Sequence, residues 1–532
     1  MSRAEIPPLP ASVDIYDTTL RDGSQQEGLS LTVDDKLRVA RQLDELGVAY
    51  IEGGWPGANP KDDEFFRRAP AELKLSTATL VAFGSTRRPR GRAEGDETLR
   101  HLLDAGTSAV CIVAKAWDRH VTEALRTDLD DAVAMASDSV AFLRHAGLRV
   151  FLDAEHFFDG WKANPGFSLR VLAAAEEAGA EALVLCDTNG GTLPHEVEEI
   201  VSDVRNRTSA QLGLHFHNDG GCGVANTLTG VRMGATQVQG CINGYGERTG
   251  NADLCAAIPD LTLKMGIRTI DRERLGRLMP VAHHIAELVN VAPNAQQPYV
   301  GQSAFATKAG LHTSAIARGR DLYSHAEPEA VGNSSRVMVG ELSGRSTIQL
   351  KAAELGLDLD PLAVTDVLSR LKELEYQGYH FEVADGSLEL LMRAATGWEQ
   401  AFFRLESSRV ITEQRGNSRL VTEATIKIHV RGDRVVATAE GNGPVNALDA
   451  ALRQAIGANY PALAGVHLTD YKVRVLDTAK GTAAVTRVLI DSTDGERTWS
   501  TIGVSENIIE ASWQALSDSI VYGLLHAQTA QD

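Results

Sequence analysis

The sequence predicts an α/β protein: a closed (β/α)₈, or TIM, barrel, then a helical subdomain and a C-terminal α+β domain. The barrel is predicted by the first 275 residues, in which short β-branched runs alternate with amphipathic helical stretches. Eight strand-like runs can be counted, the number that closes a parallel barrel. The C-terminal domain is predicted by two similar halves after residue 402, each with about three strands followed by a helix.

The expected barrel strands are short and apolar. They lie at 13–16, 48–51, 75–81, 109–113, 150–152, 182–185, 212–216 and 236–242. Most of the intervening helical stretches end in a glycine, as at Gly47, Gly106, Gly147 and Gly179, which is typical of helix C-termini. An open, doubly wound sheet is the structural alternative. The missing Gly-rich phosphate loop after the first strand argues against it.

The alternation stops after the barrel, and the predicted domains are 1–275 (barrel), 276–400 (helical subdomain) and 401–532 (duplicated βββα unit). In the last domain, Asn446 and Asn507 each begin a similar pentad after a glycine-containing turn, so each is expected to be the N-cap of the helix in its half. A duplicated unit of this kind is typical of a dimerising or ligand-sensing module.

Composition indicates a soluble, globular, multidomain protein, with 43% hydrophobic and 23% charged residues in a chain of 532. We find no apolar run long enough for a transmembrane helix and no secretory signal at the N-terminus. A net charge of −19 argues against a nucleic-acid-binding protein. The five cysteines are scattered without CxxC pairs, so we expect neither a disulfide framework nor a structural zinc site, and a reducing cytoplasm fits.

The end of the first strand, "DIYDTTLRDGSQQEG", has two interpretations. It could be a capped strand-to-helix turn, because Asp and Thr bond their own backbone and Gly23 permits a bend. It could also be part of a site, because barrels of this type carry their sites at the C-terminal ends of the strands. Polar residues do collect at these ends: Arg21, Asp22, Glu52, Asp153, Glu155, Asp187, Thr188 and Asn189.

The motif "LHFHND" at the end of the seventh strand places His215 and His217 two residues apart, so both imidazoles project from one face. Together with a carboxylate from another strand, for which Asp22 is the obvious candidate, they form a divalent-metal site. A lone histidine would more often be a hydrogen-bonded core residue; the pair beside an acidic rim favours the metal. Asn251, in "GERTGNADL", could cap the following helix or offer its carbonyl oxygen to the metal, and spacing leaves both open.

These motifs carry a resemblance that covers nearly the whole chain. "DTTLRDG", "HFHND" and "GERTGNADL" in this order resemble the acyl-CoA-condensing barrel enzymes that include the 2-isopropylmalate, homocitrate and citramalate synthases. "IEGGWPGANPKD", "DAEHFFDGWKAN", "CDTNGGTLP", "SAFATKAGLHTSAI" and "DYKVRVL" are most similar to the long-chain citramalate synthases.

The resemblance implies a role for each site residue. Asp22, His215, His217 and Asn251 would hold a divalent metal (Zn, Mn or Mg), and Arg21 would neighbour the keto acid. Thr188 would contact the substrate carboxylate, with Glu52 and Asp153 also at the substrate site, while Glu155 and His312 would serve in acid–base chemistry. Ser314 and Thr307 depart from residues common in relatives, so the family pattern names no partner for His312.

The implied reaction is a Claisen-type condensation of acetyl-CoA with pyruvate, followed by hydrolysis of the thioester to citramalate and CoA, in isoleucine biosynthesis. The nearest alternative is a 2-isopropylmalate synthase that uses 2-oxoisovalerate, since a pocket distinguishes one methylene by only about 1–3 kcal/mol. A non-catalytic, metal-bound scaffold is the alternative from another class. The duplicated domain resembles the regulatory domain of these synthases, which implies a homodimer and an amino-acid effector, isoleucine, bound near the turns "EGNGPVN" and "TIGVSEN".

Overall fold

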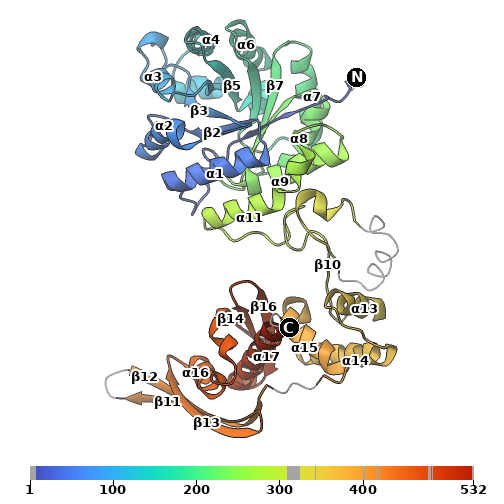
Figure 1. Cartoon of the computed structure of the whole chain (residues 1–532). Helices are drawn as coiled ribbons and strands as arrows, with labels where there is room; N and C mark the ends of the chain where they lie inside the picture. The colour runs from blue at the N-terminus through green and yellow to red at the C-terminus, as the bar shows by residue number, and fades with distance from the viewer. Residues whose placement is uncertain are drawn as a thin grey trace. The chain divides into compact units, whose positions relative to one another are not determined.

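The structure is a computed structural model of the chain (Figure 1). It describes residues 7–307, 324–341, 343–398, 402–415, 419–476, 481 and 483–529. The predicted site residue His312 and its neighbour Ser314 lie outside these residues. The chain divides into two compact units: the first runs to Phe305 and adds His325–Ser335, and the second contains the remainder. The predicted domain boundaries after residues 275 and 400 stay predictions.

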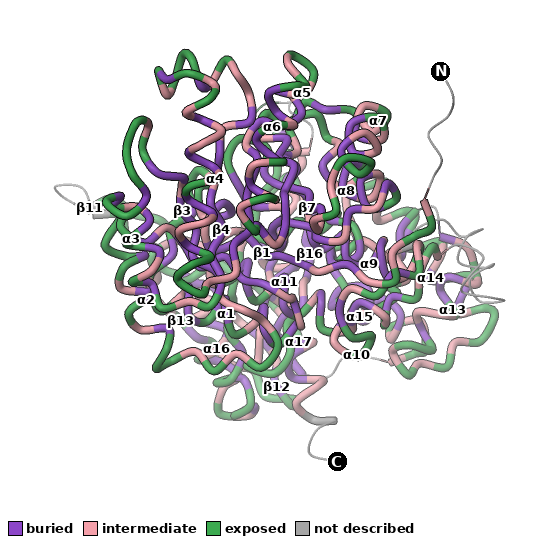
Figure 2. The backbone as a smooth tube through the Cα atoms, turned by 90° about the horizontal axis from the view of Figure 1, so that it is seen from above, coloured by how far each residue is buried: buried purple, intermediate pink, exposed green. Residues whose placement is uncertain are grey.

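The first unit contains a closed barrel of parallel strands, which confirms the predicted fold (Figure 1). The strands are β1 (Asp14–Asp17), β2 (Tyr50–Gly54), β3 (Thr79–Ser85), β4 (Ala109–Lys115), β5 (Arg149–Glu155), β6 (Ala182–Asp187), β7 (Gln211–Phe216) and β8 (Gln237–Gly240). Each strand pairs with its neighbour in sequence, and β1 closes the barrel on β8 with Asp14 opposite Gln237. The strands are buried over most of their length (Figure 2) because helices cover the outside of the barrel.

The helices of the first unit surround the strands (Figure 1). They are α1 (Val33–Leu46), α2 (Pro60–Glu72), α3 (Glu97–Asp104), α4 (Leu129–His145), α5 (Phe157–Ala163), α6 (Pro165–Glu177), α7 (Pro194–Arg205), α8 (Gly223–Arg232), α9 (Leu254–Pro259), α10 (Arg272–Leu275) and α11 (Leu278–Leu288). Shorter turns are η1 (Gly23–Gln25), η2 (Ala93–Gly95), η3 (His120–Leu125), η4 (Ile242–Gly244), η5 (Asp260–Lys264) and η7 (Pro328–Val331).

Helix α1 shows how local sequence sets these boundaries. The Thr32 side chain accepts a hydrogen bond from the Asp35 amide, and the Asp35 carboxylate accepts one from the Thr32 amide, so a capping box begins the helix. The helix ends where Gly47 adopts a φ of 98°, a conformation that side chains with a Cβ disfavour. Its apolar face joins the large core cluster of the first unit.

Strand β3 begins four residues later than the predicted start at residue 75. The buried carboxylate of Asp44 on α1 accepts hydrogen bonds from the amides of Ser76, Thr77 and Ala78. These amides are therefore committed to a side chain and cannot join the barrel ladder. At its other end the strand continues to Ser85, four residues beyond the predicted end.

The second unit contains the helices α13 (Arg345–Glu354), α14 (Pro361–Gln377) and α15 (Asp385–Ala395), and the turns η8 (Phe381–Val383) and η9 (Pro461–Gly465). A short parallel pair joins β9 (Ala306–Thr307) to β10 (Arg336–Val337). None of the helices in the described part of the chain has the length and apolar character that a membrane-spanning segment requires.

The predicted βββα duplication is confirmed. The first half is β11 (Arg404–Arg415), β12 (Arg419–Val430), β13 (Asp433–Gly441) and α16 (Pro444–Ile456); the second is β14 (His467–Val475), β15 (Thr486–Thr493), β16 (Thr498–Ser505) and α17 (Ile508–Thr529). Each half is an antiparallel sheet in sequential order. The first strand of each carries a register shift near its start, between Leu405 and Ser407 in one and between Leu468 and Asp470 in the other.

The two predicted N-caps of the duplicated unit have different outcomes. Asn507 accepts hydrogen bonds from the Ile509 and Glu510 amides, so it caps α17 as predicted. The prediction for Asn446 is wrong, because Gly443 is the N-cap of α16 and Pro444 occupies the first turn. Asn446 therefore lies inside the helix, where its Oδ1 accepts a hydrogen bond from the Asn442 amide of the preceding turn.

Candidate functional site

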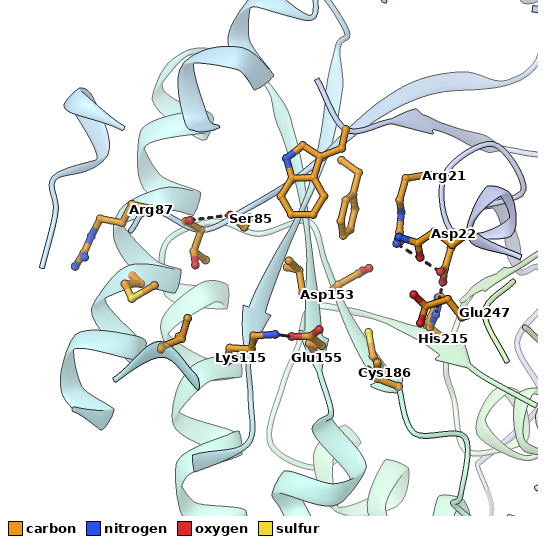
Figure 3. A pocket seen from close by; sticks show the side chains of 18 of the residues that line it. Arg21, Asp22, Ser85, Arg87, Lys115, Asp153, Glu155, Cys186, His215 and Glu247 are labelled. Atoms are coloured by element: carbon orange, nitrogen blue, oxygen red, sulfur yellow. Dashed lines mark hydrogen bonds and ion pairs between the residues drawn. The ribbon is translucent and has the colours of Figure 1, made fainter. Parts of the chain in front are cut away.

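Three buried side chains at or just after the ends of β1 and β7 converge at the C-terminal rim of the barrel, and Figure 3 shows two of them, Asp22 and His215. His215 is in β7, His217 follows that strand, and Asp22 follows β1. The Nε2 atoms of His215 and His217 lie 3.2 and 3.5 Å from Asp22 Oδ2. One ligand atom from each residue can be chosen so that all three lie within 4.8 Å of one another, a spacing that could hold a metal ion.

The electrostatics keep the Asp22 carboxylate ionised. Burial alone would raise the pKa of Asp22, but the Arg21 charge and the hydrogen bonds from His215 and His217 hold it well below its usual value. A negatively charged oxygen between two imidazoles is a suitable donor set for a divalent cation.

Asn251 adds an unsatisfied oxygen beside the histidines. The residue is 1% exposed and forms an isolated bridge with His217. Its Nδ2 donates to the Tyr245 carbonyl at 3.1 Å, while its Oδ1 has no hydrogen-bond partner among the described residues. The N-cap alternative is wrong, because the Asp253 side chain caps α9. A buried carbonyl oxygen without a partner is costly unless a ligand satisfies it, so Asn251 fits the metal alternative.

Arg21 is held in place by groups from β1, β2 and β3. Its Nε donates to Glu52 Oε1 at 2.5 Å, and its guanidinium carbon lies 3.8 Å from the centroid of the Phe83 ring. The Tyr16 hydroxyl donates to the other oxygen of Glu52 at 2.7 Å. Burial raises the pKa of Glu52 although Arg21 opposes this shift. Glu52, which does not line the cavity, thus orients the guanidinium, and Arg21 itself lines the cavity.

The ends of β4 and β5 place Lys115 beside Glu155, where the ammonium group and the carboxylate form an ion pair (Figure 3). Both side chains are partly exposed to the cavity, unlike Asp153 two residues earlier, which is 3% exposed. Burial raises the pKa of Asp153. Of the two β5 acids that line the cavity, Glu155 is therefore the more accessible to a solvated ligand.

The loop after β6 brings Thr188 to the same rim. Its Oγ1 accepts a hydrogen bond from the His156 amide at 3.1 Å. Its carbonyl oxygen accepts one from Arg248 Nη2 at 2.6 Å. The Oδ2 of the neighbouring Asp187 accepts a hydrogen bond from the Thr192 amide in the same loop, while its Oδ1 has no partner among the described residues.

One cavity of about 500 Å³ connects these groups. Its lining includes the predicted residues Arg21, Asp22, Asp153, Glu155, Thr188, His215 and His217. Glu52 and Asn251 do not line this cavity; Glu52 lies behind Arg21, and Asn251 lies beside His217.

The residues at or beside this cavity that sequence reasoning missed include Phe83, Ser85, Lys115 and Gln239. Phe83 and Ser85 were missed because the third strand was predicted to end at residue 81. Lys115 was missed because the fourth was predicted to end at 113. Continuing each strand by two or four residues on the same face would have found all three. Gln239 lies within the predicted eighth strand, and no motif marked it.

Comparisons with known proteins place the chain in a family. Residues 12–278 match the HMGL-like family, residues 299–378 the homocitrate synthase post-HMGL domain-like family, and residues 382–524 the LeuA allosteric (dimerisation) domain. An (R)-citramalate synthase of Streptomyces coelicolor is 53% identical over 98% of each chain. Enzymes with the same description from Synechocystis and Aquifex aeolicus are 50% and 49% identical, each over 96% of this chain and 96% and 98% of the relative.

This chain belongs to the citramalate synthase family. The assignment confirms the resemblance found in the motifs, and it explains why one chain joins an HMGL-like barrel to a LeuA-type allosteric domain. Members of this family are acyl-CoA-condensing transferases, so the cavity at the barrel rim is the candidate active site.

Proposed function

We propose that this protein condenses acetyl-CoA with pyruvate and hydrolyses the resulting thioester, which yields (R)-citramalate and free CoA. The observation that carries the proposal is the convergence of Asp22, His215 and His217 with the Arg21 cation on one cavity. A metal-bound scaffold without activity would not need Arg21, Glu155 and Thr188 in the same cavity. The full-length similarity to proteins described as (R)-citramalate synthases supports pyruvate over 2-oxoisovalerate as the keto acid.

Asp22, His215, His217 and Asn251 would hold a divalent metal ion. The site fits such an ion because it offers an ionised carboxylate, two imidazoles and a buried amide oxygen that lacks a partner among the described residues. A bound Zn²⁺, Mn²⁺ or Mg²⁺ would supply Lewis-acid stabilisation of the alkoxide that develops at the keto-acid ketone.

Arg21 and Thr188 would position the keto acid. The guanidinium is fixed by Glu52 and Phe83, and Arg21 lines the cavity as preorganised positive charge. Thr188 lines the same cavity, where its hydroxyl can donate to the substrate carboxylate while its Oγ1 accepts from the His156 amide.

Glu155 would act as the base that removes a methyl proton of acetyl-CoA. The carboxylate lines the cavity and forms an ion pair with the ammonium group of Lys115. A base positioned in this way contributes about 10²–10⁴-fold to the rate. His312 remains the other candidate for acid–base chemistry. Attack of water on the citramalyl thioester then breaks the C–S bond and releases CoA.

The duplicated C-terminal domain would form a homodimer and bind isoleucine as an inhibitor. Its match to a LeuA allosteric (dimerisation) domain supports both roles. The turn before α16 offers backbone N–H groups at a helix N-terminus, where an amino-acid carboxylate is favoured.

A thiol-release assay tests the proposal. The purified chain is stripped with a chelator and supplied with Mn²⁺, Mg²⁺ or Zn²⁺, then mixed with acetyl-CoA and either pyruvate or 2-oxoisovalerate. We expect metal-dependent thiol release that prefers pyruvate in kcat/KM. His217→Ala should lose most metal affinity and activity, because a missing ligand leaves the site too open. His195→Ala, on the exposed face of α7, is the matched control.

Two outcomes would contradict the proposal. Equal or better turnover of 2-oxoisovalerate would assign the protein to 2-isopropylmalate synthesis. Parent-like turnover by His217→Ala after chelation and metal re-addition would remove His217 from the ligand set.

A further inference from the structure

Gln239 on β8 lies between a candidate metal ligand and a buried acid. Its Oε1 is 3.0 Å from His215 Nδ1, and its Nε2 donates to Asp153 Oδ1 at 3.0 Å. Gln239 is fully buried, and His215 and Asp153 are 4% and 3% exposed. His215 and Gln239 are also register partners between β7 and β8, so the contact is built into the closed barrel.

The chemistry of the three side chains determines which atom donates and which accepts in each of these hydrogen bonds. Asp153 Oδ1 also accepts a hydrogen bond from the Cys111 thiol at 3.1 Å, so it is the acceptor for both neighbours. The amide nitrogen of Gln239 must therefore face Asp153, and the amide oxygen must face His215. Since an amide oxygen only accepts, the proton of His215 lies on Nδ1. His215 Nε2 then faces Asp22 Oδ2 at 3.2 Å, on the side where a metal ion would be held.

The other glutamine of β8, Gln237, shows that burial on this face of the strand does not by itself produce such hydrogen bonds. Gln237 lies two residues earlier on β8, projects from the same face and is also fully buried. Neither its Oε1 nor its Nε2 has a hydrogen-bond partner among the described residues. His217 also lacks a partner on Nδ1 within the described chain, so His215 is the histidine of the pair whose ring is oriented by a side chain.

We propose that Gln239 is a positioning residue that fixes the tautomer and ring orientation of His215 for metal binding, with Asp153 anchoring its amide. The inference rests on the metal site of the proposed function and goes beyond it, because Gln239 is not a ligand and contacts no substrate. Groups that orient a ligating histidine in this way change metal affinity by about 10–100-fold when they are removed.

Gln239→Met and Gln237→Met in the full chain test the inference, because methionine keeps the length of glutamine without its hydrogen bonds. The probe is Co²⁺, titrated into the stripped protein without substrates and followed by visible absorption and by competition with a chelator. We expect Gln239→Met to bind Co²⁺ about 10–100-fold more weakly than the parent chain. The Gln237→Met variant should bind Co²⁺ with the affinity of the parent chain, because neither polar atom of the Gln237 side chain has a hydrogen-bond partner among the described residues. Thiol release by Gln239→Met should return at saturating metal, which a merely unfolded site would not allow.

Gln239→Glu keeps an acceptor for His215 Nδ1 and is the second variant should the methionine variant fail to fold. We expect its Co²⁺ affinity to remain within about tenfold of the parent chain. The inference is overturned if Gln239→Met binds Co²⁺ like the parent, if Gln237→Met loses as much affinity, or if Gln239→Glu loses as much as His217→Ala. Because Co²⁺ binding is measured without substrates, a chain that binds metal but releases no thiol would contradict the proposed reaction alone.

Discussion

At the scale of single residues, the Arg21 guanidinium of the candidate site lies against the ring of an aromatic residue. Phe83 lies under the Arg21 guanidinium, and the Trp55 ring contacts the edge of Phe83 at 5.3 Å between centroids. Both aromatic residues line the cavity. Phe83 therefore serves two purposes: it provides a face for the cation and it limits the space next to Arg21 for the side chain of the keto acid.

We predict that Phe83→Leu shifts the preference toward the larger keto acid. A smaller side chain leaves room for the branch of 2-oxoisovalerate, and one methylene in a pocket corresponds to about 1–3 kcal/mol of discrimination. The ratio of kcat/KM for 2-oxoisovalerate over pyruvate should rise at least about fivefold. Phe66→Leu is the control, since Phe66 has the same 4% exposure and is not among the residues that line the cavity. An unchanged ratio in Phe83→Leu would mean that another wall limits substrate size.

At the scale of elements, the loops after β6, β7 and β8 are joined by one side chain. Arg248 donates from Nη2 to the Thr188 carbonyl, and from Nε and Nη2 to the Asp219 carboxylate at 2.7 and 3.0 Å. Its own backbone has a φ of 57°, a strained conformation for a residue with a side chain. The loop that carries Asn251 is thereby tied to the loops that carry Thr188 and His217.

We predict that Arg248→Lys lowers kcat about tenfold or more with little change in thermal stability. Lysine keeps the charge but cannot bond a carbonyl and a carboxylate with one planar group, and small misplacements of site residues can cost up to about 10²-fold in rate. Arg207→Lys is the control, because Arg207 forms only an exposed i,i+4 ion pair with Asp203 on α7. Equal kcat in the two variants, measured by thiol release, would show that the loops are held without Arg248.

At the scale of the whole molecule, the candidate active site and the duplicated domain lie in separate compact units. The described residues that line the candidate active-site cavity belong to the first unit, and both βββα halves belong to the second. Helix α15 packs on β16 and α17, with Leu388 and Met392 in one cluster with Ile502. A truncation near Thr396 would strip α15 of these partners, so the effector is better tested in the full chain.

We predict that isoleucine inhibits the full chain more strongly than leucine or valine, and that Gly443→Glu weakens this inhibition several-fold. The new carboxylate would lie at the N-terminus of α16 and compete with the carboxylate of the effector. A Cβ at Gly443 meets no atom within 4 Å, so the fold should tolerate the change. Gly465→Glu, at an equally open glycine, is the control. Isoleucine titrations that give the same inhibition in both variants would place the effector elsewhere.

The sequence by itself determined the architecture and the central part of the candidate site. Side-chain periods of 2 and 3.6 residues decide which segments are strands or helices and which face is buried, so the barrel and the duplicated unit were predictable. His215 and His217 share a face within one strand, which made them recognisable without knowledge of distant partners. Strand ends were less predictable, because the Asp44 carboxylate, from another element, takes the amides of residues 76–78.

Only the tertiary structure decided which distant groups complete the site. Gln239 reaches His215 and Asp153, residues 24 and 86 positions away in the chain, because the closed barrel places β5, β7 and β8 around one interior. The two roles open to Asn251 are separated only by the structure, because Asp253 caps α9 and the Asn251 Oδ1 has no partner among the described residues. Contacts of this kind depend on register between strands, and register is a property of the closed barrel as a whole and not of any one segment.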